Sequence, residues 1–259
     1  MIKKVAEKKR TLLIDGSVIV YRIASAIEEA TEWEDDVWTL HSDAKLGKEI
    51  LDNQINHYKK KLNCGDIEIA MDDQVNFRKE IYPDYKSNRK KIRKPIIVKP
   101  LKEYLLKNYK CVSFKSLEGD DVLGILATSD KYKDNCVVLS SDKDMRTVPA
   151  IHHFIHDETT EIVDEKTADY NFMYQTLVGD LTDGFGGCPS VGGVKAQRVL
   201  ANVNKTLPDM WKAVLNEYKR ADLNEEYALT QARLARILRA SDWDKVNKKP
   251  ILWQPPHVK

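Results

Sequence analysis

The chain has 259 residues and a net charge of +2, with 42 Lys and Arg against 40 Asp and Glu. This length is enough for one full hydrophobic core, and it favours one domain with at most a smaller appended lobe. No apolar run approaches the roughly 20 residues of a transmembrane helix, and the basic N-terminus is not followed by a signal-peptide pattern. The four cysteines are widely spaced without a CxxC pair, which favours reduced thiols in a cytoplasmic protein over disulfides or a zinc site.

Short β-branched or aliphatic runs alternate with helical patterns in the first half of the chain. The runs predict strands at Thr11–Ile14, Ile67–Met71, Cys111–Phe114 and Cys136–Leu139, with a weaker fifth at Ile151–Ile155. Between them, the patterns predict helices over Ser17–Ala30, Ser42–Leu62, Val98–Lys107 and Asp120–Tyr132. Strands separated by helices are typical of a mostly parallel sheet with helices on both faces, so the predicted fold class is α/β.

The second half of the chain predicts helices alone. They cover Thr167–Val178, Val194–Ala201, Asp209–Arg220 and Glu225–Ala240. We therefore expect an α/β core over residues 1–165 and a helical lobe over residues 166–259.

Acidic residues follow the ends of the predicted strands. Because the carboxyl ends of parallel strands meet at one edge of a sheet, these side chains should lie close together. A further acidic segment, GDLTD, lies in the helical half. Together these segments supply nine candidate metal ligands: Asp15, Asp72, Glu118, Asp120, Asp121, Asp142, Asp144, Asp180 and Asp183.

Any one of these acids could be a turn residue or a helix N-cap. Five acid-bearing segments at one rim of a sheet would, however, repel one another unless cations neutralise them. Oxygen ligands without His or Cys suit Mg²⁺ or Mn²⁺, and the number of acids suggests two or more ions. Two ions about 3.5–4 Å apart can activate water and stabilise the leaving oxygen in phosphoryl transfer. The acids alone therefore predict metal-assisted phosphoryl chemistry.

The segment from Asn76 to Pro95 is strongly basic. It contains eight Lys and Arg against two acidic residues, with Tyr82 and Tyr85 between them. Such a run can be a solvated surface, but cations for phosphates and aromatic rings for bases are also what single-stranded nucleic acid requires. Because the segment directly follows Asp72, we favour nucleic-acid binding.

A glycine-rich stretch, GFGGCPSVGGVK, follows Asp183. Glycines permit close backbone approach, and the N–H groups at the start of the next helix can bind an anion. These features predict a phosphate-contacting helix-hairpin-helix at about residues 174–203, with a flexible interhelical loop as the alternative.

Five segments in this order resemble the motifs of the 5′ nuclease superfamily, which includes phage flap endonucleases and the 5′-nuclease domain of bacterial DNA polymerase I. They read LLIDGS, MDD followed by NFRKEIYPDYKSNRK, LEGDDVLG, SSDKDM, and GDLTDG before the hairpin. The resemblance covers residues 11–201 and is greatest to the 5′→3′ exonucleases of short-tailed virulent bacteriophages.

This resemblance implies a PIN-like core with a helical arch over about residues 76–98. It implies a monomeric 5′→3′ exonuclease with flap endonuclease and RNase H-like activity, which acts on DNA 5′ ends, flaps or RNA/DNA hybrids. The expected setting is phage DNA replication or host DNA degradation, in the cytoplasm of an infected bacterium. A K⁺ ion at the hairpin is also implied.

Residue roles follow from the same resemblance. Asp15, Asp72, Glu118 and Asp120 would surround one metal and Asp142, Asp144, Asp180 and Asp183 a second, with Asp121 near both. Catalysis would depend on Asp72 and Asp120, and on Lys86 at the scissile phosphate. The candidate DNA contacts are Arg78, Tyr82, Tyr85, Lys86, Arg89, Lys90, Gly192, Gly193 and Lys195.

The hairpin departs from the family pattern. Gly184, Gly186 and Ser190 stand where the family has Asn, Pro and Gly, and Lys195 is displaced by one position. We therefore expect duplex binding to differ in geometry or strength.

Two other functions are compatible with parts of the sequence. They are a PIN-type ribonuclease and a non-catalytic DNA-binding replication scaffold. A haloacid-dehalogenase-type phosphatase is disfavoured, because Ser17 stands where that chemistry needs a second acid.

Overall fold

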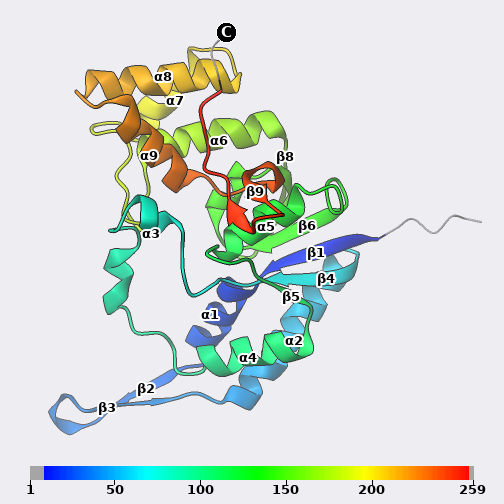
Figure 1. Ribbon diagram of the computed structural model, residues 1–259. Coiled ribbons are helices and arrows are strands. Elements are labelled where there is room, and N and C mark those ends of the chain that lie inside the picture. Colours follow the sequence, from blue (N-terminus) through cyan, green and yellow to red (C-terminus); the bar gives the residue numbers. More distant parts are fainter. Residues whose placement is uncertain (1–8, 257–259) are drawn as a thin grey trace, which may run out of the picture.

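A computed structural model describes residues 9–256, apart from the side chains of residues 90 and 91 (Figure 1). Six strands form one sheet in the order β5-β4-β1-β6-β7-β8. The first five are parallel and β8 pairs antiparallel with β7. Their bounds are β1 (Arg10–Asp15), β4 (Cys64–Ala70), β5 (Cys111–Val112), β6 (Cys136–Ser140), β7 (Ala150–Phe154) and β8 (Thr159–Val163). The predicted mostly parallel sheet is confirmed.

Strand β1 lies at the centre of the sheet and is buried on both faces. Leu12 and Ile14 pack into the hydrophobic cluster on one face, and Leu13 packs into the cluster on the other. This division follows from the alternation of side chains along a strand. Helices α1 (Gly16–Ala26), α2 (Ala44–Lys61) and α4 (Val98–Asn108) cover the first face. Helix α5 (Gly119–Ala127) covers the second.

The helical lobe consists of α6 (Glu165–Val178), α7 (Gly193–Ala201), α8 (Leu207–Arg220) and α9 (Glu225–Ala235) around a cluster of its own. Figure 1 shows these helices gathered at one end of the molecule, beyond the sheet. Helices α6 and α7 flank the loop of residues 179–192, and the helix-hairpin-helix expected at about residues 174–203 stays a prediction. None of the described helices is long and apolar enough to cross a membrane.

The C-terminal segment returns from the lobe to the α/β core. Helix α9 ends at Ala235 rather than at the predicted Ala240, because Arg236 adopts an extended conformation. Ile237, Leu238 and Trp243 then pack beside α5, where the 3₁₀ helix η4 (Ala240–Asp242) leads to the short strands β9 (Trp243–Asp244) and β10 (Lys249–Pro250). The predicted division at residue 165 stays a prediction, but this segment contacts both parts.

Two further predicted helices are shorter in the structure. Helix α1 ends at Ala26 instead of Ala30, and a hairpin of β2 (Glu29–Glu32) and β3 (Trp38–His41), with the 3₁₀ turn η1 (Glu34–Asp36), follows it. Helix α5 ends at Ala127 instead of Tyr132. Strand β8 was not predicted, because most of its residues lie outside the core and give no apolar pattern.

The basic segment, where the resemblance implies a helical arch, contains only short pieces of helix. It contains one turn of helix, α3 (Arg78–Ile81), and one 3₁₀ helix, η2 (Ser87–Lys91), joined by irregular backbone. Pro83 and the left-handed conformation of Lys86, with φ of 55°, prevent a regular helix between them. We call residues 76–97 the basic strap.

Gly124 in α5 marks the close approach of the returning C-terminal segment. A Cβ atom at this position would lie 2.3 Å from the carbonyl oxygen of Leu238. We expect Gly124→Ala to destabilise the protein by about 1–3 kcal/mol through overpacking, although alanine is the better helix former. Urea unfolding measures this difference.

Gly186→Ala is the matched control, since a Cβ there meets nothing within 4 Å. Equal stability of the two variants would show that the C-terminal segment does not pack tightly on α5.

Candidate metal and DNA site

The first group of acids lies at the carboxyl ends of the central strands. Asp15 ends β1 and also caps α1, because its Oδ1 accepts a hydrogen bond from the N–H of Val18 at 2.9 Å. Asp72 follows β4, and its Oδ1 accepts from the N–H of Gly119 at 2.9 Å. This contact brings Asp120, in the first turn of α5, to the same edge as Asp15 and Asp72.

The carboxylates of this group perturb one another. Burial raises the pKa of Asp15 to about 6, and the charges of Asp72 and Asp142 add to the effect. Burial also raises the pKa of Asp120 well above its ordinary value, with a further contribution from Asp15 and Asp142. Oδ1 of Asp120 is buried and has no hydrogen-bond partner among the described residues. Negative charge is therefore crowded here beyond what the protein neutralises.

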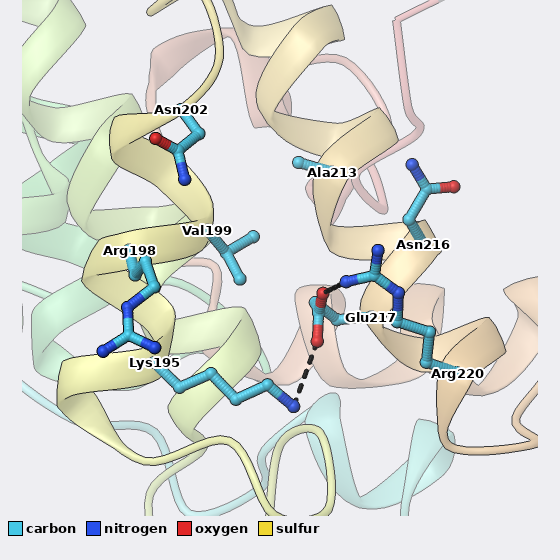
Figure 2. A pocket seen from close by; sticks show the side chains of 8 residues that line it. All are labelled: Lys195, Arg198, Val199, Asn202, Ala213, Asn216, Glu217 and Arg220. Carbon is cyan, nitrogen blue, oxygen red and sulfur yellow. Dashed lines mark hydrogen bonds and ion pairs between the residues drawn. The ribbon is translucent and has the colours of Figure 1, made fainter.

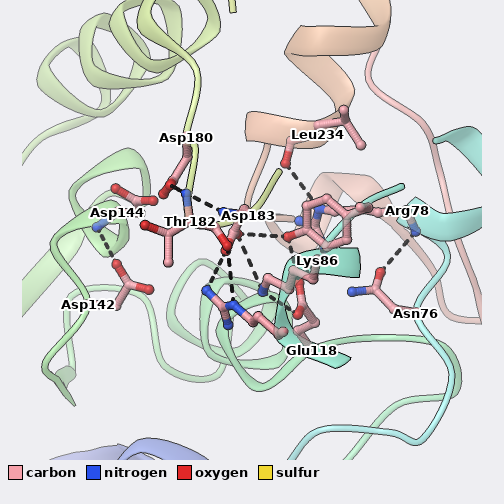
Figure 3. Close-up of polar contacts among 12 residues, drawn as sticks. Asn76, Arg78, Lys86, Glu118, Asp142, Asp144, Asp180, Thr182, Asp183 and Leu234 are labelled. Carbon is pink, nitrogen blue, oxygen red and sulfur yellow. Dashed lines mark hydrogen bonds and ion pairs between the residues drawn. The ribbon is translucent and has the colours of Figure 1, made fainter. Parts of the chain in front are cut away.

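The second group of acids lies around the 3₁₀ helix η3 (Lys143–Thr147) and the loop after α6 (Figure 3). Asp142 caps η3 by accepting from the N–H of Asp144 at 2.8 Å. Burial raises the pKa of Asp144 to about 7, and the charges of Asp142 and Asp180 add to it. Since Asp142 also raises the pKa of Asp15 and Asp120, it links the two groups.

The basic strap closes over Glu118 and Asp183 (Figure 3). Lys86 donates a hydrogen bond to Glu118 and lies 3.4 Å from Oδ2 of Asp183. Nη2 of Arg89 is 2.6 Å from Oδ1 of Asp183. The hydroxyl of Tyr85 lies 3.0 Å from Oε2 of Glu118 and 3.0 Å from Oδ2 of Asp183, and its single hydrogen can be donated to either acid. Burial opposes ionisation of Glu118, but the nearby cations outweigh it and lower the pKa of Glu118 to about 2. Burial raises the pKa of Asp183 despite the nearby charges of Lys86 and Arg89.

A buried ion pair fixes the start of the strap. Nη1 and Nη2 of Arg78 contact the two oxygens of Asp121 at 2.6 and 2.7 Å, and the N–H of Leu238 donates to Oδ1 of Asp121 at 3.1 Å. Arg78 also donates to the carbonyls of Leu234 and Arg236. Both oxygens of Asp121 are thus occupied and the carboxylate is fully buried.

This ion pair corrects two predictions. Arg78 is 3% exposed and cannot reach a DNA backbone as a surface cation. Asp121 bonds to Arg78 instead of facing the other acids. The sequence was misleading here because Arg78 lies in the basic segment and Asp121 lies in the acidic motif LEGDDVLG.

The aromatic residues of the strap also differ from the prediction. Tyr85 is 2% exposed and packs in the cluster of the helical lobe, and Tyr82 packs half-buried against the same cluster. Tyr85 therefore cannot stack on a base in this conformation; its hydroxyl instead orients Glu118 and Asp183. The side chain of Lys90 lies outside the described residues.

A cavity of about 580 Å³ opens beside the first group of acids. Its walls include five of the predicted metal ligands, Asp15, Asp72, Glu118, Asp120 and Asp142, together with Lys86 and Arg89. Asp144, Asp180 and Asp183 do not line this cavity. Gly192, Gly193 and Lys195 lie at the start of α7, where Lys195 pairs with Glu217 at 3.1 Å.

The acids fit divalent cations in chemistry, although their present contacts are with protein cations. Among residues 9–256, no three His, Cys, Asp or Glu side chains converge closely enough to hold an ion. Asp72, Glu118 and Asp183 contact Lys102, Lys86 and Arg89 instead. The unpartnered oxygen of Asp120 and the raised pKa values of Asp15 and Asp144 indicate that these contacts leave negative charge uncompensated.

Comparison with known proteins identifies the family. Residues 10–173 match the family described as "5'-3' exonuclease, N-terminal resolvase-like domain". The chain belongs to this 5′-3′ exonuclease family. It is 31% identical to an exodeoxyribonuclease of Enterobacteria phage T3 and 30% identical to an exonuclease of Escherichia phage T7. Each match covers 98% of this chain and 96% of the relative.

Solved structures share the fold of this 5′-3′ exonuclease. A phage T5 5′-exonuclease with bound zinc superposes with a TM-score of 0.67 at 15% identity, over 87% of this chain and 89% of that chain. A phage T5 flap endonuclease in complex with DNA and metal ions gives a TM-score of 0.66 at 14% identity, over 87% of this chain and 88% of that chain. The resemblance predicted from the five motifs is confirmed.

Two residues beside the acids were not predicted from the sequence. Ser17 and Lys102 both contact Oδ2 of Asp72, with Nζ of Lys102 at 3.3 Å, and they contact each other at 2.9 Å. Ser17 belongs to the motif LLIDGS and could have been named from it. Lys102 gave no sequence signal, because only the packing of α4 against α1 brings it to Asp72.

The buried pair of Arg78 and Asp121 predicts a contrast between adjacent acids. We expect Asp121→Asn to destabilise the protein by about 3–5 kcal/mol, because it leaves a buried guanidinium without its counter-charge. Asp120→Asn should leave stability unchanged or higher, since it removes a repelled and unpartnered charge. Urea unfolding without divalent metal compares the two variants, and equal destabilisation would contradict the structural role of Asp121.

Proposed function

We propose that this protein is a divalent-metal-dependent 5′ nuclease, which hydrolyses phosphodiester bonds at the 5′ ends of DNA. The observation that carries this proposal is the cavity where mutually repelling carboxylates lie beside Lys86 and Arg89. Such a surface can hold cations and a phosphate together. The curated relatives from phages T3 and T7, named exodeoxyribonuclease and exonuclease, support the same activity.

The two groups of acids provide the proposed metal ligands. Asp15, Asp72, Glu118 and Asp120 would hold one ion and Asp142, Asp144, Asp180 and Asp183 the second, with Mg²⁺ or Mn²⁺ favoured by ligands that are all oxygen. Paired ions in such sites activate water and stabilise the leaving oxygen in an in-line displacement. Asp121 is left out of this set because Arg78 occupies its oxygens. A K⁺ ion at the loop of residues 179–192 remains part of the proposal.

Lys86 and Arg89 would position the scissile phosphate. Both side chains line the cavity and now contact carboxylates at its edge. A phosphate that enters the cavity would replace these contacts, and Lys86 would then donate to an oxygen on which charge develops. The left-handed backbone of Lys86 is held by the hydrogen bond from its N–H to the carbonyl of Asp183 at 2.8 Å. The strap thus positions the side chain of Lys86 beside the acids before substrate binds.

The proposed substrates are 5′ ends and 5′ flaps of DNA, and RNA/DNA hybrids, and the proposed active form is a monomer. The phage T5 flap endonuclease is described in complex with DNA and metal ions, which supports DNA as the partner. Digestion of a 5′-labelled duplex beside a 5′-flap substrate separates exonuclease from flap endonuclease preference.

Asp120→Asn should abolish cleavage in Mg²⁺ while DNA binding is kept, because it removes a metal ligand without touching the strap. EDTA should have the same effect on the wild-type protein. Gel assays of cleavage, with anisotropy for binding, measure both. Near wild-type turnover of Asp120→Asn would refute the metal assignment, and wild-type binding without cleavage in Mg²⁺ or Mn²⁺ would favour a non-catalytic scaffold.

Lys86→Met should slow cleavage by about 100-fold to 1000-fold, the usual effect of removing one preorganised donor to developing charge. Single-turnover rates at saturating enzyme measure this loss. Lys99→Met, at an exposed position of α4, is the charge-matched control and should cleave normally. If both variants cleave at the wild-type rate, Lys86 does not act at the phosphate.

A further inference from the structure

The basic strap is held in its middle by the loop of residues 180–184, which follows α6 (Figure 3). The carbonyls of residues 181, 182 and 183 all accept hydrogen bonds from the strap. Nδ2 of Asn88 lies 3.2 Å from the first two of these oxygens, and Nε of Arg89 lies 3.3 Å from the second. The N–H of Lys86 donates to the third at 2.8 Å. We call this set of contacts the clasp.

Gly184 allows the loop to lie this close to the strap. Its backbone has φ of 82°, in the left-handed region that favours glycine. A Cβ atom at this position would lie 3.2 Å from the carbonyl oxygen of Asp84 and 3.4 Å from the amide nitrogen of Lys86. The strap and the loop therefore approach each other at a point where a side chain would push them apart.

The loop closes its own turn without the strap. Oδ1 of Asp180 accepts hydrogen bonds from the N–H of Thr182 at 2.7 Å and from the N–H of Asp183 at 3.3 Å. Asn88, in contrast, reaches the loop across 93 and 94 positions of the sequence. Its contacts therefore determine where the turn lies relative to the strap, rather than the shape of the turn.

Asn88 also lies between the two cations of the strap that contact Asp183. Nζ of Lys86 is 3.4 Å from Oδ2 of Asp183, and Nη2 of Arg89 is 2.6 Å from Oδ1. Lys86 and Arg89 line the cavity beside the first group of acids, whereas Asn88 does not. Asn88 is thus placed to act on the loop, and through the loop on the acids that it carries.

We propose that Asn88 is a positioning residue, which holds the loop against the strap and so keeps Asp180 and Asp183 in place for a divalent ion. Opening of the strap would release both acids together, because the clasp joins the two segments. Binding of an ion by the second group of acids then depends on a closed strap. The metal in this proposal rests on the proposed nuclease function, whereas the contacts of the clasp do not.

The first test measures opening of the strap without metal. Asn88→Ala removes the donors of the clasp. Asn108→Ala is the matched control, because Nδ2 of this exposed residue also donates to a backbone carbonyl, that of Tyr104 at 2.8 Å, but outside the site. Limited digestion with trypsin in EDTA, followed by mass spectrometry, gives the rate of cleavage after Lys86 and Arg89.

We expect the strap of Asn88→Ala to be cut about 3-fold to 30-fold faster than that of the control, the effect of losing one or two hydrogen bonds. Cuts after Lys195 and Arg198, which lie on α7 in the helical lobe (Figure 2), are the internal reference for unfolding of the lobe and should stay unchanged. Equal rates of strap cleavage in Asn88→Ala and Asn108→Ala would overturn the clasp.

Gly184→Asn tests the clasp from the side of the loop. Asparagine tolerates a left-handed backbone, so the main effect of the substitution is the added side chain against Asp84 and Lys86. We expect faster cleavage of the strap, as in Asn88→Ala. A strap that resists trypsin as well as that of the wild-type protein would contradict the close approach at Gly184.

The second test measures metal binding. Calorimetric titration with Mn²⁺, without DNA, should show one ion bound as in the wild-type protein and a second bound about 3-fold to 30-fold more weakly by Asn88→Ala. The Mg²⁺ concentration for half-maximal single-turnover cleavage should rise by a similar factor, and Asn88→Gln should restore part of both. Faster strap cleavage with unchanged Mn²⁺ binding would overturn the positioning role and leave the clasp purely structural.

Asn88→Asp separates positioning from charge. The substitution adds a negative charge beside the second group of acids, so electrostatic attraction alone would strengthen Mn²⁺ binding. We expect weaker binding, because a carboxylate cannot donate to the carbonyls of the loop. Stronger binding by Asn88→Asp would overturn the positioning role. Absence of cleavage by the wild-type protein would refute the nuclease function instead, and the trypsin and Mn²⁺ measurements would still test Asn88.

Discussion

The buried ion pair of Arg78 and Asp121 is the constraint on which the site depends. Arg78 begins the basic strap, Asp121 lies in the first turn of α5, and the same two side chains bond to the backbone at Leu234, Arg236 and Leu238. One charge pair therefore joins the strap, the helix that presents Asp120, and the segment that returns from the lobe. Because a buried charge without its partner is costly, these three elements are held in one arrangement.

This arrangement makes the crowding of acids tolerable. Asp15, Asp120 and Asp144 have raised pKa values, and burial is the largest cause in each case. Crowded carboxylates favour proton or cation uptake and oppose folding. The strap offsets part of the repulsion through Lys86 and Arg89, and Lys102 does so from α4. A divalent ion would neutralise the negative charge that remains on these acids. The same carboxylates would therefore determine both the affinity for metal and the stability of the folded protein.

The sequence predicted the central strand correctly, because Leu12, Leu13 and Ile14 form the continuous apolar run that is typical of a strand covered on both faces. The acids that follow such runs could then be placed at the carboxyl ends of the strands. Prediction from the sequence failed where a residue's role depends on tertiary packing. Arg78 and Tyr85 lie in a basic and aromatic run typical of nucleic-acid binding, yet α9 and the lobe bury them. Lys102 reaches Asp72 only through the packing of α4. Residue type indicated the chemistry, whereas burial decided which residues are free to perform it.

Burial of Arg78 and Tyr85 also changes how the strap can recognise a substrate. With these side chains engaged, the residues of the strap that face the cavity are mainly cations, including Lys79, Lys86, Arg89 and Lys94. Cations contact phosphates without reading bases, so the strap favours a backbone over a sequence. Recognition by the strap would then depend on the position of phosphates relative to the acids, and not on the identity of the bases.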